Sequence, residues 1–244
     1  MRTLLLIPLL LLTACASPDV AETIETPDDL IAAMQARYAG NWYETLTFEQ
    51  ETIQYRADGS ADTATWHEAL QVPGRLRIDI GDRAEGNGLI FRNDSLFSFQ
   101  NGLQVNAQPT IHPLLLLGFD VYFLSPEAVQ AGLDSLGFDR SVMHQTIWQD
   151  RPVYVVGAAE GDLSAPQFWV DQKHLYFVRL LQPVGPGGVQ TQDVRFNSYE
   201  RQGGGWVAPE VLFYVDSTLV MVERYKDVQT GVRLDEALFD PDRW

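Results

Sequence analysis

Arg75-Leu76-Arg77-Ile78-Asp79-Ile80 alternates charged and apolar side chains at every step. Successive side chains of a β-strand point to opposite faces, so this alternation predicts a strand with one buried face and one solvated face. Pro73-Gly74 immediately before it and Asn101-Gly102 further on are dipeptides typical of tight turns. Together they predict neighbouring antiparallel strands joined by short hairpins.

Similar runs recur from Glu44 onward and predict a long antiparallel meander, open or closed. The segment Val184-Gly185-Pro186-Gly187-Gly188 has the composition of a hairpin loop and is too short to link two domains. We therefore expect one domain over residues 27–244. The twelve predicted strands are 44–57, 62–71, 75–80, 87–92, 95–100, 140–149, 152–159, 165–171, 174–182, 189–200, 205–216 and 218–226.

Helices are predicted before the first strand and in the middle of the meander. Thr26-Pro27-Asp28-Asp29 combines a capping hydroxyl, a proline for the first turn and acidic residues, and Gly40 is placed to end the helix. The run 113–124 is nearly all apolar, and Ser125-Pro126-Glu127 then starts a second helix that ends near Gly137. Because these segments interrupt the meander, we expect them to cover a face or an edge of the sheet.

Several predicted strands are apolar on both faces, including 153–155, 176–178 and 219–222. An antiparallel sheet with one solvated face normally alternates more cleanly than this. Two explanations remain open at this point. Either helices cover the second face, or the sheet lines an apolar cavity.

The N-terminus has the organisation of an export signal. Arg2 precedes a run of nine apolar residues, Leu4–Leu12, which is about half of the roughly 20 that a membrane-spanning helix needs. Leu12-Thr13-Ala14-Cys15 resembles the lipobox of bacterial lipoproteins, in which the cysteine is acylated after cleavage. We expect a signal peptide over 1–14, lipidation of Cys15 with a tether over 15–26, and attachment to the outer membrane on its periplasmic side.

Composition excludes several classes of protein. The chain has 33 acidic and 17 basic residues, a formal net charge of −16, which disfavours binding to nucleic acid or charge-driven docking on an anionic membrane. A single cysteine excludes an internal disulfide framework and a cysteine-rich zinc site. Membrane attachment would then depend on the lipid anchor.

No catalytic or metal-binding constellation stands out. The histidines are His67, His112, His144 and His174, which are scattered, and no nucleophile elbow, phosphate-binding loop, dinucleotide motif or His-Glu-x-x-His sequence is present. We expect no enzyme activity, no metal and no cofactor. Glu223-Arg224 and Arg195 are interpreted as surface charges.

Four short motifs follow one another along the chain. They are Thr47-Phe48-Glu49-Gln50, Val72–Asp79, Gly88–Phe99 and Gly231–Pro241. Their order resembles the LolA/LolB superfamily of periplasmic lipoprotein-localisation factors, which has a Phe-x-Gln strand, a Pro-containing turn into an apolar strand, an Asp/Asn-rich turn before Leu-Phe, and a terminal Asp-x-x-x-Phe. The resemblance extends from about residue 27 to residue 241.

The resemblance implies a mainly antiparallel α+β fold, an incomplete β-barrel of about 11–12 strands with an N-terminal helix. It also implies a concave apolar face that holds acyl chains beneath lid helices, here residues 112–137. An arginine that the family's carrier has before the proline is Val72 in this chain, so any role of that arginine cannot be carried over. Residues expected in the cavity or lid are Leu76, Ile78, Leu115, Leu116, Phe119, Val121, Phe123, Phe177 and Met221.

On this basis we expect a lipid-anchored, periplasm-facing protein that binds acyl chains of lipoproteins or lipids, in lipoprotein sorting or lipid transfer. One alternative is a non-enzymatic regulatory or envelope-stress-sensing domain that uses the same fold to bind a protein partner. A third is an enzyme, such as an esterase or glycosidase, acting on envelope material.

Overall fold

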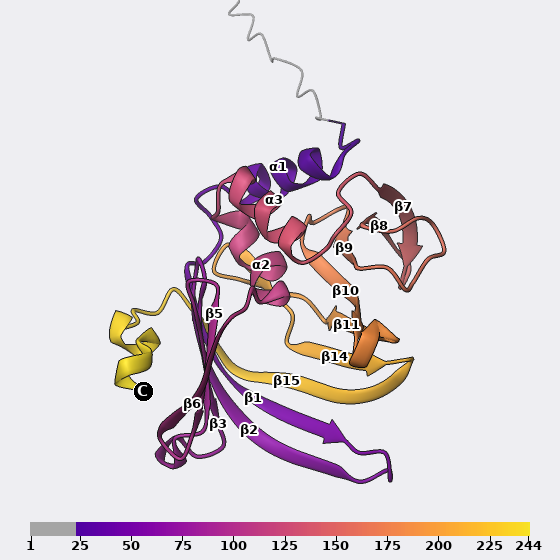
Figure 1. Ribbon diagram of the computed structural model, residues 1–244. Helices are drawn as coiled ribbons and strands as arrows, with labels where there is room; N and C mark the ends of the chain where they lie inside the picture. The colour runs from indigo at the N-terminus through magenta and orange to yellow at the C-terminus, as the bar shows by residue number, and fades with distance from the viewer. Residues whose placement is uncertain (1–22) are drawn as a thin grey trace, which may run out of the picture.

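The computed structural model describes residues 23–244. Most of the strands in this part of the chain form a single curved antiparallel sheet (Figure 1). Within this part of the chain the sheet has 13 strands in the order β6-β5-β4-β3-β2-β1-β15-β14-β11-β10-β9-β8-β7. The two edge strands, β6 and β7, do not pair with each other, so the sheet remains open. This confirms the expected incomplete barrel.

The first half of the sheet is a meander of six strands, each paired with its neighbour in sequence. Leu76 and Ile78 of its third strand are each only 7% exposed, as the alternation of charged and apolar side chains predicts. The strands are β1 (Thr45–Tyr55), β2 (Ala61–Gln71), β3 (Arg75–Ile80), β4 (Gly88–Arg92), β5 (Ser95–Gln100) and β6 (Leu103–Pro109).

The second half is a similar meander that returns to the first half at the centre of the sheet. Its last strand, β15, pairs with β1 from Leu46↔Thr230 to Gln54↔Met221. A separate hairpin of β12 (Glu200–Gln202) and β13 (Gly205–Val207) lies between β11 and β14 in sequence. The other strands are β7 (Met143–Trp148), β8 (Arg151–Val156), β9 (Gln167–Asp171), β10 (Phe177–Val184), β11 (Gln190–Asn197), β14 (Glu210–Val215) and β15 (Thr218–Thr230).

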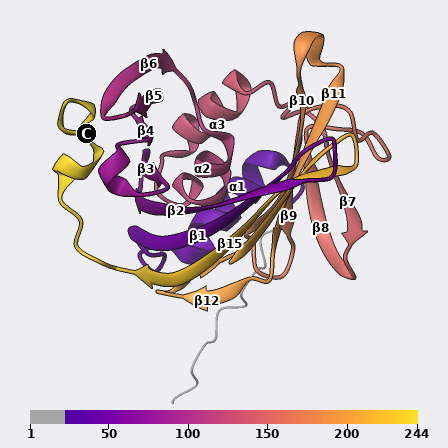
Figure 2. The same ribbon diagram turned by 90° about the horizontal axis from the view of Figure 1, so that it is seen from below.

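Three helices lie on the concave side of the sheet, between its two halves when it is viewed from below (Figure 2). They are α1 (Pro27–Tyr38), α2 (Pro113–Gly118) and α3 (Pro126–Ser135). The Thr26 hydroxyl caps the start of α1, as the sequence predicts, and together with the Asp29 carboxylate it forms a capping box. None of the helices among residues 23–244 is long and apolar enough to cross a membrane.

Side-chain contacts hold these helices together. The Gln35 amide of α1 donates hydrogen bonds of 2.9 Å to the carbonyl oxygens of Val121 and Leu124. Arg140, after α3, contacts Asp28 at 2.9 Å and Asp134 at 2.7 Å. The segment 112–137 is therefore fixed to α1 as well as to the sheet.

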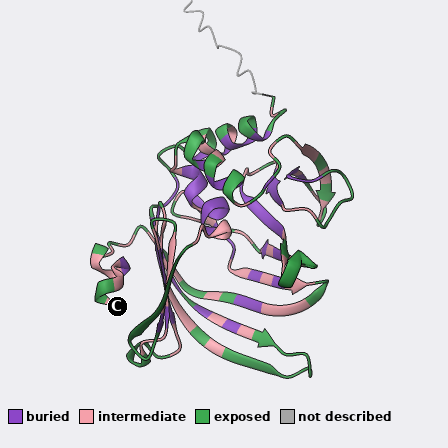
Figure 3. Ribbon diagram, viewed as in Figure 1, coloured by how far each residue is buried: buried purple, intermediate pink, exposed green. Residues whose placement is uncertain are grey.

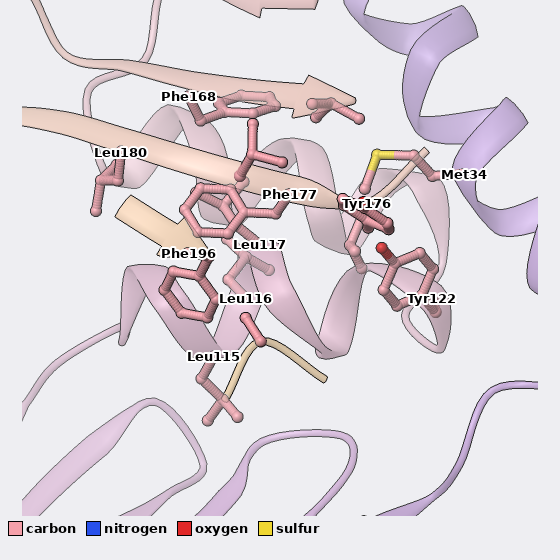
Figure 4. Packing of buried hydrophobic residues seen from close by; sticks show 14 of the residues in the cluster. Met34, Leu115, Leu116, Leu117, Tyr122, Phe168, Tyr176, Phe177, Leu180 and Phe196 are labelled. Carbon is pink, nitrogen blue, oxygen red and sulfur yellow. The ribbon is translucent and has the colours of Figure 1, made fainter. Parts of the chain in front are cut away.

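The main hydrophobic core lies between the helices and the second half of the sheet. Buried residues concentrate there, whereas the far ends of β1 and β2 are exposed (Figure 3). Phe168 and Phe177 from the sheet are each 1% exposed and belong to the same buried cluster as Leu116 and Leu117 of α2 (Figure 4). Helices thus cover the concave face of β9 and β10, which is one of the two explanations that the apolar pattern left open.

The C-terminal residues lie against the outside of the first meander, after β15 (Figure 1). Trp244 stacks on Phe99 with ring centroids 4.1 Å apart, and the Arg77 guanidinium lies 4.1 Å from the Trp244 ring. Short 3₁₀ turns occur at η1 (Arg83–Glu85), η2 (Asp120–Tyr122), η3 (Pro186–Gly188), η4 (Glu236–Phe239) and η5 (Pro241–Arg243).

Some predicted strand boundaries are wrong. Strand β6 is absent from the prediction although Leu103, Val105 and Ala107 alternate with polar residues, and all seven of its residues are exposed at the edge of the sheet. The run predicted over 205–216 is two strands, since Ala208 and Pro209 separate β13 from β14. The segment 184–188 is a hairpin loop between β10 and β11, as predicted.

Candidate ligand-binding cavity

An apolar cavity of about 220 Å³ lies between the concave face of the sheet and residues 112–119. For comparison, an engineered apolar cavity of about 150 Å³ binds benzene, so this one has room for an apolar segment of at least that size. The side chains that line it are Phe48, Trp66, Glu68, Leu70, Leu76, Ile78, Leu89, Phe91, His112, Leu114, Leu115, Phe119, Phe196, Phe213, Met221, Glu223 and Tyr225.

Helix α2 covers this cavity, and the residues at its start explain why a helix forms there. Pro113 occupies the first turn, and His112 Nδ1 accepts a hydrogen bond of 3.2 Å from the Leu115 backbone N–H. The four leucines that follow give a short helix that is apolar on every side. Leu115 therefore reaches the cavity, while Leu116 and Leu117 are buried with the helices and the second meander.

Burial of His112 lowers the pKa of its imidazole to about 4, so the ring is neutral at pH 7. The ring also packs edge-on against Phe91, with centroids 4.5 Å apart. We interpret His112 as part of an apolar roof rather than as a charged group.

The structure brings five of the predicted lining residues together around the cavity: Leu76, Ile78, Leu115, Phe119 and Met221. Leu116 lines the neighbouring groove instead. Val121 and Phe177 lie in the buried core, and Phe123 packs on its margin. The sequence pattern does not separate Leu115 and Phe119 from Val121, since all three lie in the same apolar run, nor Met221 from Phe177, since both lie on strands that are apolar on both faces.

A second hollow, a groove of about 440 Å³, adjoins the cavity and shares Phe91, His112 and Leu115 with it. The Asp120 carboxylate lies in this groove and accepts a hydrogen bond of 2.9 Å from the Gly74 backbone N–H. Burial raises the pKa of Asp120 to about 7, and repulsion from Asp94 acts in the same direction. This contact joins the β2–β3 turn to the covering segment.

Two carboxyl groups in the cavity wall were not foreseen from the sequence. Glu68 of β2 and Glu223 of β15 both line the cavity. Burial raises the pKa of Glu223 to about 8. Burial, together with repulsion from Glu223, also raises the pKa of Glu68 well above its usual range. Interpreting Glu223 as a surface charge was therefore wrong.

A signal for this burial exists in the sequence. Met221 and Glu223 are two residues apart on one strand, so a Met221 that faces the cavity places Glu223 on the same face. Trp66, Glu68 and Leu70 share a face of β2 for the same reason. Glu223 was interpreted as a surface charge because glutamate is usually exposed, although the two-residue period of the strand places it beside Met221.

Arg195, also interpreted as a surface charge, is less exposed than expected. Its side chain is 28% exposed, lies 2.7 Å from Asp193, and stacks over Tyr214 at 4.2 Å. Asp193 also binds the buried Arg179 through two hydrogen bonds of 2.8 Å. This cluster stabilises the second meander, away from the cavity.

The expected lipidation site, Cys15, and the expected signal peptide lie outside the described residues. Among residues 23–244, no group of three or more histidine, cysteine, aspartate or glutamate side chains is arranged to hold a metal ion.

No protein-family model matches the sequence, and no curated protein matches it significantly. Solved structures are similar over most of their length. A putative outer membrane lipoprotein-sorting protein domain from Vibrio parahaemolyticus superposes with a TM-score of 0.60 at 13% identity, over 88% of this chain and 96% of that one. A LolA superfamily protein from Nitrosomonas europaea gives a TM-score of 0.55 at 12% identity, over 88% and 99%.

The chain has a LolA/LolB-like fold. A DUF1329 family protein from Desulfovibrio piger is similar as well, with a TM-score of 0.58 at 15% identity over 87% of this chain and 95% of that one. At such identities the likeness establishes the architecture, which confirms the predicted fold. The LolA/LolB-like sheet is open, and its concave side carries the apolar cavity described above.

Proposed function

We propose that this protein is a binding protein of the bacterial envelope, anchored by a lipid at Cys15, that holds acyl chains of lipoproteins or lipids in the 220 Å³ cavity. Its place would be the periplasmic side of the outer membrane, in lipoprotein sorting or lipid transfer. It would act by binding, without catalysis. The observation that carries the proposal is an apolar cavity on the concave side of a LolA/LolB-like sheet, covered by an apolar helix.

The chemistry of the wall supports an apolar ligand. Most of its side chains are aromatic or aliphatic, and they present no fixed geometry that a rigid polar ligand would need. Each methylene that leaves water for such a wall contributes about 0.8 kcal/mol. A flexible chain can also continue into the adjoining groove, which shares three residues with the cavity.

The test is lipid binding by the purified protein. Native mass spectrometry should detect lipid that copurifies, and the lipid-free protein should bind a fluorescently labelled neutral acylglycerol. A protein that carries no lipid and takes up none of the probe would refute the proposal. That result together with capture of one stable protein partner would favour the interaction-domain alternative.

A cavity-filling variant locates the ligand. Met221→Trp enlarges a side chain in the cavity wall, and we expect it to weaken binding of the labelled acylglycerol at least about tenfold. Ile147→Trp is the matched control, because Ile147 is 68% exposed on the edge strand β7 and lines none of the hollows described here. Equal binding by both variants would show that the ligand lies elsewhere.

A further inference from the structure

The apolar cavity has one polar wall, located where the two halves of the sheet meet. Glu68 on β2 and Glu223 on β15 lie on opposite sides of β1. Between them β1 contributes Gln50, which is 0% exposed and stands opposite both Trp66 and Tyr225. Because Trp66 and Tyr225 line the cavity, the Gln50 side chain belongs to the same face of the sheet.

This wall presents several hydrogen-bond acceptors, and one of them, the Gln50 amide oxygen, lacks a partner. The Gln50 Nε2 atom donates to the Thr52 hydroxyl at 2.8 Å, but Gln50 Oε1 accepts no hydrogen bond from any of residues 23–244. Buried carbonyl oxygens are nearly always paired in folded proteins, so an unpaired one points to a donor that is supplied from elsewhere. The two carboxyl groups add further acceptor oxygens at the same place.

The wall also lacks positive charge. No lysine or arginine is among the residues that line the cavity, and the only basic side chain, His112, is neutral at pH 7 because burial lowers its pKa to about 4. A carboxylate without a counter-charge in an apolar site is strongly disfavoured. The raised pKa of Glu223 expresses that cost.

We propose that the polar wall of Glu68, Gln50 and Glu223 binds a protonated primary amine carried on an apolar chain, so that the cavity prefers cationic amphiphiles to anionic ones. This inference rests on the proposed function and specifies the ligand of that same cavity. An ammonium group provides three donors and one positive charge, which are the two things that this wall lacks. The chain of the amphiphile then lies against the apolar side chains around Leu76 and Phe119.

The test compares three ligands with identical chains, dodecylamine, dodecanol and laurate, by titration calorimetry below their micelle-forming concentrations. We expect the protein to bind dodecylamine at least about tenfold more tightly than laurate, with dodecanol between them. The double variant Glu68→Gln with Glu223→Gln removes both carboxyl groups with little change in shape, and it should bind all three within about threefold of one another. Glu49→Gln is the matched control, because Glu49 is exposed and neighbours Gln50 on β1.

The outcomes separate this inference from the proposed function. Laurate binding that equals or exceeds dodecylamine binding overturns the amine preference and leaves acyl-chain binding intact. A preference that survives in the double variant also overturns it, since the charge would then be recognised elsewhere. If none of the three ligands binds, the proposed function fails together with the inference.

Two sources in an envelope could supply the amine, and further titrations distinguish them. One is a single-chain phospholipid with an ethanolamine head group, and the other is a lipopeptide with a free amino terminus. N-acetylation removes the positive charge of either one and should remove its advantage in affinity. The source whose affinity falls on acetylation is the one that this wall recognises.

Discussion

Replacing Asp120 by asparagine should stabilise the protein at alkaline pH and leave it almost unchanged in acid. The carboxyl is 6% exposed and has a pKa of about 7 in the folded protein, against 3.8 as the ordinary value. Asparagine keeps an acceptor oxygen for the Gly74 N–H and removes the charge. The variant therefore separates the cost of the buried charge from the value of the hydrogen bond.

The sign and size follow from proton linkage. Between pH 4 and pH 7 the folded protein retains a proton on Asp120 that the unfolded chain has already lost, so the free energy of unfolding falls as pH rises. The slope is about 1.4 kcal/mol per pH unit, and the difference of about 3 units gives a loss of roughly 4 kcal/mol by pH 8. Above pH 7 both states have lost the proton, and this contribution becomes constant.

Urea unfolding, followed by tryptophan fluorescence at pH 4 and pH 8, measures the effect. The difference in unfolding free energy between Asp120→Asn and the unmodified protein should be about 4 kcal/mol larger at pH 8 than at pH 4. Glu160→Gln, at an exposed turn carboxylate that lines neither the cavity nor the groove, changes the net charge equally and should stay within about 0.5 kcal/mol of the unmodified protein. If the effect of Asp120→Asn is the same at both pH values, the carboxylate is not buried as described.

Two further predictions concern local structure. Thr26→Ala removes the hydroxyl that accepts a 3.1 Å hydrogen bond from the Asp29 N–H, and it should lower the unfolding free energy by about 1 kcal/mol. Thr26→Ser keeps this hydrogen bond, so an equal loss of stability in both variants would argue against capping. Gly204 and Gly59 both have a φ of +84°, but an added Cβ would lie 1.9 Å from the Asn41 carbonyl oxygen at Gly204 and within 4 Å of nothing at Gly59. Gly204→Ala should therefore cost about 1–3 kcal/mol more than Gly59→Ala in the same urea assay, and equal costs would contradict the close approach.

The strand period predicts the architecture well wherever one face of the sheet is buried and the other is solvated. Arg75–Ile80 forms a strand with Leu76 and Ile78 buried, and the meander on either side of it follows from the turn signals. The period does not predict that Asp79, on the opposite face and 2.8 Å from Arg77, is only 5% exposed. The same period is present in β6, where Leu103 and Val105 alternate with polar residues, but this edge strand was not predicted and its apolar side chains are exposed. The period also fails to separate Leu115, at the cavity, from Val121, in the packed core, because position in three dimensions decides which apolar side chain leaves a gap.

The polar wall shows a different limit of the sequence. Glutamate is rarely buried without a partner, so the residue type alone predicts that Glu68 and Glu223 lie at the surface. Their strand neighbours place them inside, since Met221 and Leu70 share their faces. Where composition and period disagree on a strand, the disagreement itself is a reason to suspect a ligand site.

The pairing of β1 with β15 has a consequence for the order in which the chain folds. Other neighbours in the main sheet are adjacent in sequence or separated by one small hairpin, but Leu46 must find Thr230 near the other end of the chain. Each meander can assemble from strands that are near one another in sequence, whereas the pairing of β1 with β15 must wait for the final strand, because closing so long a loop is slow. Until β15 has paired, the polar part of the cavity wall, with Gln50 on β1 and Glu223 on β15, is not assembled.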